Sequence, residues 1–484
     1  MWPRETEIRR MSKDTSPKKG PKEGSKKSGA AKRAAPAGRS PLQRGAQVGG
    51  LVVLSFLLGA MVVQFKMFPY PQFLEGAFMA LASTVVRVKV ESWTVSEIAF
   101  NDEPVTTHVP EKTYDGYTFY TSAHSSSAYL VDMNGHKIHE WHAPFSKVWP
   151  KPPHVVESVK DVDVFWRRAH LFSNGDVVAM FETPTLSPWG MGVVKVDKDS
   201  NVLWSFAERA HNDISVDSGG NVYAITHEFR DTRDAPVSDN PQLPSTVLDD
   251  FVVKLSPQGE ELQRVSLLGA ITKSDFRHIL NIFPDGDEFV TAPWDPLHTN
   301  SVKVIEPAFA QHHSWAKPGD VIVSMRAFDA LAAIDMSESD LGVVWANRGF
   351  WMGQHDADLL ENGNVMLFDN LGHSGAVGRR SRVLEFDPTT NAIKWVYPPN
   401  DEKRFFSSTR SSQQLLPNGN VLITASDAGF AFEVTRDGEA VWVFMNPAEV
   451  IEGEERGQAG LLGATRFPQH YVTFALQQPS SASK

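Results

Sequence analysis

The sequence predicts an all-β fold, a six-bladed β-propeller, preceded by a disordered basic tail and a single transmembrane helix. Two kinds of β-hairpin alternate along the body of the chain, and the pair repeats about every 45–55 residues. A charge-free stretch of 21 residues near the N-terminus has the length of a membrane-spanning helix. The segment before it is strongly basic, with 13 Lys and Arg against 4 Asp and Glu in residues 1–46.

The basic tail and the apolar stretch define the N-terminal organisation. Residues 1–44 are rich in Lys, Gly, Ser, Pro and Ala, and they bury too little apolar surface to offset their chain entropy, so we expect disorder. Residues 45–66 form the predicted transmembrane helix. A cleaved signal peptide is the competing interpretation, but the basic region is too long for one and no small-residue cleavage site follows.

The position of the basic residues also predicts a topology. Lys and Arg beside a membrane span are retained in the cytoplasm. We therefore expect a single-pass protein of the inner (plasma) membrane, with a cytoplasmic N-terminus and a periplasmic or otherwise extracytoplasmic C-terminal domain. Residues 67–113 are predicted to be a helical stalk or linker, residues 114–476 the propeller, and residues 477–484 a disordered tail.

Composition excludes several function classes. The rest of the chain carries 34 Lys and Arg against 54 Asp and Glu, so the body is acidic and has no chain-wide footprint for nucleic acid. The chain has no cysteine, which excludes disulfides, thiolate metal sites and cysteine nucleophiles. No phosphate-cradling glycine motif lies between a strand and a helix, so the sequence does not support a nucleotide cofactor.

The two hairpins differ in their turns. The first kind joins two apolar strands through a glycine-containing turn, in which Asn-Gly or Gly-Asn supplies the positive φ angles of a tight hairpin. The second kind has an Asp-containing turn and usually ends in Trp, which we interpret as packing between sheets. Examples of the first are "HLFSNGDVVAMF", "HDADLLENGNVMLF" and "SQQLLPNGNVLITA"; examples of the second are "VVKVDKDSNVLW", "RVLEFDPTTNAIKW" and "AFEVTRDGEAVW".

One hairpin of each kind makes a four-stranded unit. The last strand-like segment, "GATRFPQHYVTFA", is expected to complete the partial unit at 117–142 and so close a ring of six blades. A pair of β-sandwiches is the alternative, which the regular spacing disfavours. Units begin near residues 168, 211, 298, 355 and 412, with one large insertion around 265–297.

Three consecutive units open with a histidine. The first strand of each blade lines the central channel of a propeller, so residues at the strand entries face one another across one mouth. Asn300 shares a face with His298 by the two-residue period of a strand, and Arg326 ends the second strand of that hairpin. The predicted mouth contains His211, His298, His355, Arg326 and Asn300.

These side chains suit the transfer of a small, singly charged oxyanion such as a sulfuryl or phosphoryl group. A neutral imidazole is a competent nucleophile, and a covalent intermediate divides one difficult displacement into two easier ones. The oxygens of the transferring group need fixed positive charge and hydrogen-bond donors, which Arg326, His298 and Asn300 offer. Each such donor typically lowers a barrier by about 3 kcal/mol.

Several segments resemble the bacterial arylsulfotransferase family: "QHDADLLENGNVMLFDN", "SRVLEFDPTTNAIKWVY", "SSQQLLPNGNVLI", "DPLHTNSVKVI", "VIVSMR" and "AHNDISVD". Members of this family are six-bladed propellers that transfer a sulfuryl group from a phenolic sulfate ester to another phenol through a sulfohistidine. The resemblance covers roughly residues 115–475. It implies a small-molecule aryl sulfate donor, a phenolic acceptor and no cofactor.

The same resemblance implies roles for the residues of the mouth. His355 would be the nucleophile, and Arg326, His298, Asn300 and His211 would bind the sulfuryl oxygens, one histidine exchanging the phenol proton as acid and base. The chain departs from the enterobacterial members at Ala327, where a second polar side chain is expected, and in having a stalk and anchor instead of a β-sandwich. It therefore resembles the broader family more than that subgroup.

Structural and functional alternatives stay open. His355 could cap a strand, His211 and Asn300 could have purely structural contacts, and Arg326 could pair with Asp356 or Asp358. The spacing of His136, His139 and His142 places the middle one on the opposite face of a strand, which disfavours a metal site. A non-catalytic, membrane-anchored propeller that binds partner proteins in the envelope is the second functional hypothesis. A quinone-dependent dehydrogenase is a third, although its metal-binding carboxylates and full Trp repeat are missing.

Overall fold

A computed structural model describes most of the body of the chain. The predicted tails, 1–44 and 477–484, lie outside the described residues, and of the predicted membrane helix only Leu54 and Ser55 are described, both helical. Within the described part, no helix combines the length and the apolar character that a bilayer crossing needs. The described residues are 54–55, 95–96, 103–155, 158–186, 188–232, 245–281, 295–337, 342–372, 380–400, 405–452, 455–474 and 476.

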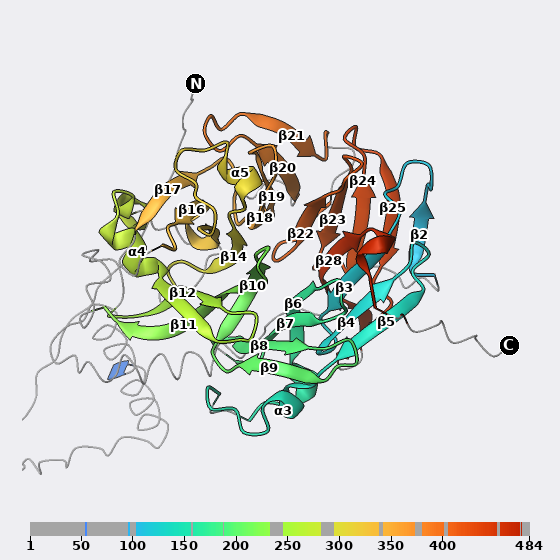
Figure 1. Cartoon of the computed structure of the whole chain (residues 1–484), viewed down its shortest axis with the longest axis horizontal. Helices are drawn as coiled ribbons and strands as arrows, with labels where there is room; N and C mark the ends of the chain where they lie inside the picture. Colours follow the sequence, from blue (N-terminus) through green and yellow to red (C-terminus); the bar gives the residue numbers. More distant parts are fainter. Residues whose placement is uncertain are drawn as a thin grey trace, which may run out of the picture. The chain divides into compact units, whose positions relative to one another are not determined.

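Six antiparallel sheets surround a common axis (Figure 1). Their innermost strands contact one another in a closed ring, in the order β28, β6, β10, β14, β18 and β22. This is the six-bladed β-propeller that the sequence predicts. Blades 1 to 3 consist of β28 (Leu461–Phe467), β3 (Tyr117–Ser122), β4 (Ser127–Val131) and β5 (Lys137–His142); β6 (Phe165–Leu171), β7 (Val177–Glu182), β8 (Gly190–Val196) and β9 (Val202–Phe206); and β10 (Ala210–Val216), β11 (Val222–Asp231), β12 (Thr246–Leu255) and β13 (Glu261–Ser266).

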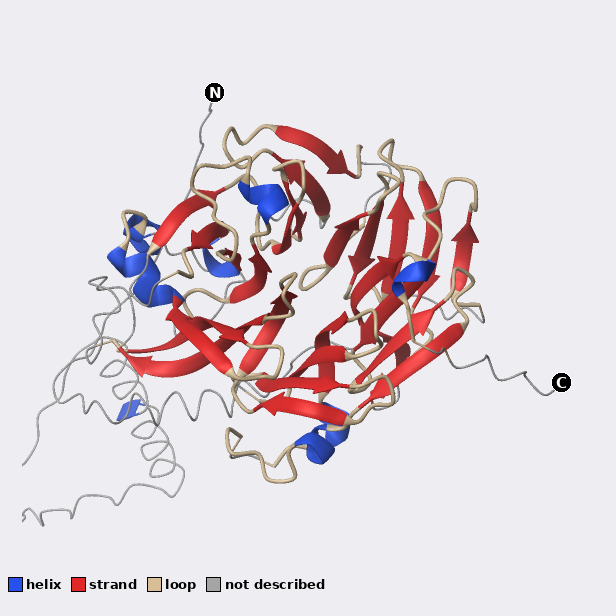
Figure 2. Ribbon diagram, viewed as in Figure 1, coloured by secondary structure: helices blue, strands red, loops and turns tan. Residues whose placement is uncertain are grey.

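The other three blades follow the same order from the axis outward. The predicted insertion contains α4 (Leu267–Lys273) and η2 (Arg277–Asn281), and the other short helices described in the body lie in connections between strands or, for η6, after the last strand (Figure 2). Blades 4 to 6 consist of β14 (Thr299–Val304), β15 (Val321–Met325), β16 (Ala330–Ile334) and β17 (Val343–Arg348); β18 (His355–Leu359), β19 (Val365–Asp369), β20 (Arg382–Phe386) and β21 (Ile393–Tyr397); and β22 (Ser412–Leu415), β23 (Val421–Ala425), β24 (Phe430–Val434) and β25 (Ala440–Met445). The other helices described in residues 103–476 are α3 (Phe145–Val148), η1 (Asp161–Asp163), α5 (Pro307–Ala310), η3 (Arg326–Phe328) and η6 (Gln469–Tyr471).

The ring closes through strands from both ends of the body. β28, from the predicted closing segment, pairs with β3, while "PQHYVTFA" leaves the sheet and contains η6. The predicted boundary at residue 114 is corrected by β2 (Val105–His108), which pairs with β25 as a fifth strand of blade 6. This short segment, VTTH, is rich in β-branched residues that fit an open sheet edge, so it joins the propeller instead of a helical stalk.

A separate small sheet joins β1 (Val95–Ser96), β27 (Glu455–Ala459) and β26 (Glu449–Glu452).

The hydrophobic core is divided among the six junctions between blades. Each of six clusters of buried side chains draws on two adjacent sheets; one, for example, joins Leu130 of β4 to Phe181 of β7. Both faces of the middle strands are therefore buried, which explains their continuous apolar runs.

Tryptophans at the blade ends pack between sheets, as the sequence interpretation states. Four of them donate an indole N–H to a backbone carbonyl in a turn of the next blade: Trp141 to Gly175 at 2.9 Å, Trp204 to Pro257 at 2.9 Å, Trp395 to Arg436 at 2.8 Å and Trp442 to Met133 at 2.9 Å. The last of these contacts joins blade 6 to blade 1 and so helps to close the ring.

Candidate functional site

The five residues of the predicted mouth come from three consecutive blades. His211 is the second residue of β10, His298 directly precedes β14, and His355 is the first residue of β18. Asn300 lies in β14, and Arg326 follows β15 as the first residue of η3. All these side chains are largely buried except that of His298, which is 22% exposed.

Short contacts connect these residues around the mouth. The Arg326 backbone N–H donates to the His298 carbonyl at 3.2 Å. Asn300 Nδ2 donates to the carbonyl of Gln354, directly before His355, at 2.7 Å. The His211 and His298 rings both contact Trp189, with centroid distances of 5.6 and 5.2 Å. Arg326 and His298 both act electrostatically on His355, so the structure brings the predicted residues into one neighbourhood.

The backbone at the mouth explains the recurrent His-Asn and His-Asp pairs. Asn212, which follows His211, has φ 63°, and Asp356, which follows His355, has φ 52°; a β-bulge interrupts the pairing at both places. Asn and Asp are the non-glycine residues that best tolerate this left-handed conformation. Bulges redirect side chains, and here the histidine turns toward the mouth while the chain continues along the channel.

A third irregularity, in β14, shows that the predicted common face of Asn300 and His298 is wrong. We placed Asn300 on the face of His298 by strict alternation, but His298 has φ 46° and the pairing of β14 shifts between Thr299 and Ser301. Alternation does not hold across a bulge. The Asn300 amide turns toward blade 5, where it holds the chain entering β18, and its Oδ1 has no hydrogen-bond partner among the described residues.

His355 is 5% exposed and its two ring nitrogens have different partners. Nδ1 lies 2.7 Å from Asn370 Oδ1 and 3.1 Å from the Gly353 carbonyl, whereas Nε2 lies 3.1 Å from the backbone N–H of Arg410. Burial, and then the Arg326 and other nearby cations, lowers the pKa of His355 well below 6.5. The imidazole is therefore neutral near pH 7, with the lone pair on Nε2.

His298 and Arg326 form the more open side of the mouth. His298 Nδ1 lies 2.6 Å from Oδ2 of the buried Asp295. Burial lowers the pKa of the Arg326 guanidinium, while Asp329, Asp295 and Asp427 raise it. A guanidinium stays protonated even so, and Arg326 is therefore a fixed positive charge beside the two histidines.

His211 stacks on a second histidine that the sequence analysis did not select. The rings of His211 and His227 lie 4.1 Å apart at 17°, and none of their four nitrogens has a hydrogen-bond partner among the described residues. Asp250 Oδ1 lies 3.3 Å from His211 Nε2. Burial, followed by His211 and Arg209, lowers the pKa of His227 well below 6.5.

His211, His227 and Asp250 lie close together but do not form a metal site. One ligand atom each from His211, His227 and Asp250 lies within 4.8 Å of the others. Imidazole lone pairs lie in the ring plane, however, and two rings stacked at 17° with centroids 4.1 Å apart have no point that lies along the lone pairs of both. The stacked arrangement does not fit one shared ion.

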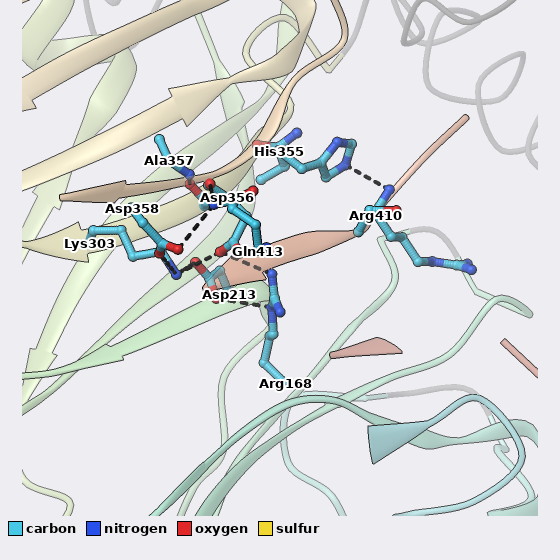
Figure 3. A network of polar contacts seen from close by, with 12 residues as sticks. Arg168, Asp213, Lys303, His355, Asp356, Ala357, Asp358, Arg410 and Gln413 are labelled. Atoms are coloured by element: carbon cyan, nitrogen blue, oxygen red, sulfur yellow. Dashed lines mark hydrogen bonds and ion pairs between the residues drawn. The ribbon is translucent and has the colours of Figure 1, made fainter. Parts of the chain in front are cut away.

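Next to the mouth, a group of buried and partly buried charged side chains connects the inner strands, and we call it the channel network (Figure 3). Lys303 Nζ of β14 lies 2.7 Å from Asp356 Oδ1 and 3.3 Å from Asp358 Oδ1, both of β18, and 3.5 Å from Asp213 Oδ2 of β10. Burial raises the pKa of Asp356, but Lys303 and Arg168 outweigh it, so the pKa is lowered.

Arg168 of β6 extends the channel network to the other blades. Its Nη2 lies 3.2 Å from Asp356 Oδ1 and its Nε 3.3 Å from Asp213 Oδ1. Gln413 of β22 donates to Asp358 Oδ2 at 3.0 Å, and Gly463 of β28 leaves room for the guanidinium, because a Cβ there would lie 2.9 Å from Nη1. Asp356 and Asp358 thus pair with Lys303 and Arg168, in place of the ion pair to Arg326 considered from the sequence.

Several residues of the neighbourhood were missed, and one sequence signal would have found two of them. Arg326 was selected at the end of the second strand of a hairpin, and it is the sixth residue counted from the start of β15. The same position in blades 3 and 5 is occupied by His227, within the longer β11, and by Asn370, directly after β19. Asp295 and Trp189 lie in connections without a repeated sequence pattern, so the repeat could not predict them.

The comparisons with solved structures are distant. A protein of unknown function from Bacteroides caccae has 10% identity and a TM-score of 0.43, over 68% of this chain and 94% of that one. A streptogramin B lyase has 10% identity and a TM-score of 0.36, over 72% and 85%. A virginiamycin B lyase from Staphylococcus aureus has 8% identity and a TM-score of 0.35, over 76% and 99%. No curated protein matches the chain.

The family comparison covers the part of the chain that carries the mouth. The model of the family described as "Arylsulfotransferase (ASST)" matches residues 168–447, from the channel network in β6 to the end of blade 6. This range contains all five predicted site residues and is more than half of the 484-residue chain. The chain belongs to the arylsulfotransferase family, a family of sulfotransferase enzymes.

Proposed function

We propose that the protein transfers a sulfuryl group from a phenolic sulfate ester to an acceptor phenol through a sulfohistidine at His355. The observation that carries this proposal is the buried, neutral imidazole of His355, whose Nε2 carries a lone pair that accepts only the Arg410 backbone N–H among the described residues and whose neighbours include the Arg326 cation. Family membership supports the aryl sulfate chemistry.

The proposed reaction has two displacement steps. In the first, the His355 Nε2 lone pair attacks sulfur, the bond between sulfur and the phenolic oxygen breaks, and the leaving phenolate takes a proton from another histidine of the mouth. In the second, an acceptor phenol gives its hydroxyl proton back to that histidine and attacks the same sulfur, and the electron pair of the N–S bond returns to Nε2. Arg326, His298, Asn300 and His211 surround the sulfuryl oxygens, and fixed donors of this kind stabilise the charge that develops in both transition states.

The loop that caps His355 has to shift for this chemistry. The Arg410 N–H occupies the direction of the Nε2 lone pair at 3.1 Å. Arg410 and the following Ser411 both have positive φ, 56° and 76°, a conformation that non-glycine residues adopt at a cost. We infer that the sulfuryl group takes the place of this N–H when the donor binds.

Membrane attachment is also part of the proposal. The charge-free residues 45–65 and the basic residues before them support a single-pass anchor with a cytoplasmic N-terminus and an extracytoplasmic propeller. In fractionated cells, the full chain should sediment with membranes and resist carbonate extraction, and a variant lacking residues 45–66 should not. Equal extraction of the two would contradict the anchor.

The activity is tested by transfer from p-nitrophenyl sulfate to phenol, following nitrophenol release and phenyl sulfate formation. Wild-type protein should form both products in equal amounts, and His355→Ala should form neither. His136→Ala is the matched control, because His136 is 71% exposed and pairs only locally with Asp132. Transfer that survives His355→Ala would contradict the proposed nucleophile.

A further inference from the structure

The two histidines nearest Arg326 differ in the partner of their second ring nitrogen. His355 Nδ1 faces a neutral amide, Asn370 Oδ1 at 2.7 Å. His298 Nδ1 faces a carboxylate, Asp295 Oδ2 at 2.6 Å. Both partners are buried: Asn370 is fully buried and Asp295 is 3% exposed. A carboxylate stabilises an imidazolium far more than an amide does, so the partner determines what each imidazole does best.

The hydrogen bonds around Asn370 fix the tautomer of His355. Asn370 Nδ2 donates to the carbonyls of Ser407 at 2.9 Å and Arg410 at 3.1 Å, which leaves Oδ1 facing His355. His355 Nδ1 has a second acceptor, the Gly353 carbonyl at 3.1 Å. Between two acceptors Nδ1 has to carry the hydrogen, so Nε2 is bare. This is the state of an imidazole nucleophile.

The environment of His298 favours proton exchange. Asp295 holds the Nδ1–H, which leaves Nε2 as the nitrogen that gains or loses a proton, and its charge stabilises the imidazolium that is present when Nε2 carries a hydrogen. Among the described residues, Asp295 contacts the His298 ring and His227 interacts with it electrostatically. Arg326, Arg167 and His298 act in the same way on His355.

We propose that Asn370 and Asp295 are positioning residues that divide the chemistry of the mouth: Asn370 holds His355 neutral as the nucleophile, and Asp295 makes His298 the group that exchanges the phenol proton. This division rests on the proposed sulfuryl transfer. It assigns a role to two residues outside the predicted site. It also selects His298, and not His211, as the histidine that serves as both acid and base.

The proposed division gives balanced steps. In the first half-reaction, His298 starts as the imidazolium that Asp295 stabilises, and its Nε2–H protonates the phenolate oxygen that leaves as the N–S bond at His355 forms. In the second, His298 Nε2 accepts the hydroxyl proton of the acceptor phenol while its oxygen attacks sulfur, and the electron pair of the N–S bond returns to His355 Nε2. His355 keeps its Nδ1–H throughout and so departs as a neutral imidazole.

The first test measures the two half-reactions of Asp295→Asn separately, by rapid mixing with p-nitrophenyl sulfate and by discharge of the labelled enzyme with phenols. Nitrophenolate leaves without a proton, so the first half-reaction should stay within about threefold of wild type. Discharge by phenol should fall by about 10²-fold or more, and the loss should shrink as acceptor phenols become more acidic. Asp335→Asn, a buried carboxylate at the other end of blade 4, is the matched control.

The second test exchanges the partner of the nucleophile. In Asn370→Asp the new carboxylate should stabilise the His355 imidazolium, so the first half-reaction should lose rate as the pH falls through neutrality, where the wild-type rate is flat. An equal slowing of both half-reactions by Asp295→Asn for every acceptor, or an unchanged pH profile in Asn370→Asp, would overturn the proposal.

The third test needs no sulfuryl transfer, so it distinguishes this proposal from the proposed function. In the full chain labelled with ¹⁵N at histidine, the ring-nitrogen shifts should show hydrogen on Nδ1 and a bare Nε2 at His355. Asp295→Asn should convert His298 to a mixture of tautomers, and Asn370→Asp should place hydrogen on both nitrogens of His355 at neutral pH. Shifts that neither substitution changes would overturn the division, whether or not the protein transfers sulfate.

Discussion

Lys303 Nζ of β14 lies 2.7 Å from Oδ1 of Asp356 in β18, the residue that follows His355. This ion pair joins two blades directly beside the candidate nucleophile. Burial alone would lower the pKa of Lys303, but Asp213, Asp356 and Asp358 together raise it, so the lysine is a stable cation. The channel network therefore positions the mouth by holding the entry of β18 against its neighbours.

Substitution Lys303→Met should destabilise the protein strongly. It leaves the buried Asp213 and Asp356 with Arg168 as their remaining cation in the channel network, and it removes the cation beside the partly buried Asp358. Removing one partner of a buried ion pair typically costs about 3–5 kcal/mol. Urea unfolding followed by tryptophan fluorescence measures the loss. Lys112→Ala, which breaks an exposed pair with Glu439, should change little, and equal effects of the two substitutions would contradict this role.

Substitution Arg326→Lys should reduce activity without unfolding the protein. Lysine keeps the positive charge but lacks the planar fork that contacts two oxygens of a tetrahedral group. Loss of such a donor typically lowers kcat by about 10²–10³-fold. Steady-state transfer from p-nitrophenyl sulfate to phenol measures kcat, and a thermal melt checks the fold. A kcat within threefold of wild type would contradict a role for Arg326 in binding the sulfuryl oxygens.

Stability should fall in mild acid because of the buried histidines. The pKa values of His355 and His227 are lowered in the folded state by burial and nearby positive groups, whereas the unfolded histidines titrate near 6.5. Above about pH 6.5 neither state is protonated, and the full stability is present. As the pH drops below that value, the unfolded chain takes up protons first. Each of these histidines therefore lowers the free energy of unfolding by about 1.4 kcal/mol per pH unit.

Substitution His227→Phe isolates one of these contributions. Phenylalanine is planar and can stack on His211, but it does not titrate. The free energy of unfolding measured between pH 5 and 7 should therefore depend less steeply on pH in His227→Phe than in the wild type. If the free energy of unfolding depended on pH equally in the wild type and in His227→Phe, His227 would have the same pKa in the folded and unfolded states, which would contradict this prediction.

The sequence predicted the fold well because local signals set its repeat. Asn-Gly turns such as those ending at Gly363 and Gly419 adopt the required positive φ, 84° and 87°. The expected unit starts at 355 and 412 coincide with the first residues of β18 and β22. β2 was missed because it is an edge strand of four residues, and a short isolated segment carries no repeat.

The site was predicted only in part, for a physical reason. The histidines that open inner strands share a sequence position and could be found from it. Their partners lie at other positions of the blades. Asn370 directly follows β19, the second strand of blade 5, and Asp295 precedes β14, the first strand of blade 4. Trp189 belongs to the connection between β7 and β8. Contacts between turns of different blades depend on the curvature of the ring, which periodicity does not encode.

The central claim is that His355 carries the sulfuryl group, and trapping that intermediate tests it most directly. The full chain is incubated with p-nitrophenyl sulfate and no acceptor, and its intact mass and its peptides are measured without acid. We expect one sulfuryl group per chain, located on His355, discharged by added phenol and absent from His355→Ala. An unmodified wild-type chain, or a sulfuryl group on another residue that persists in His355→Ala, would contradict the account.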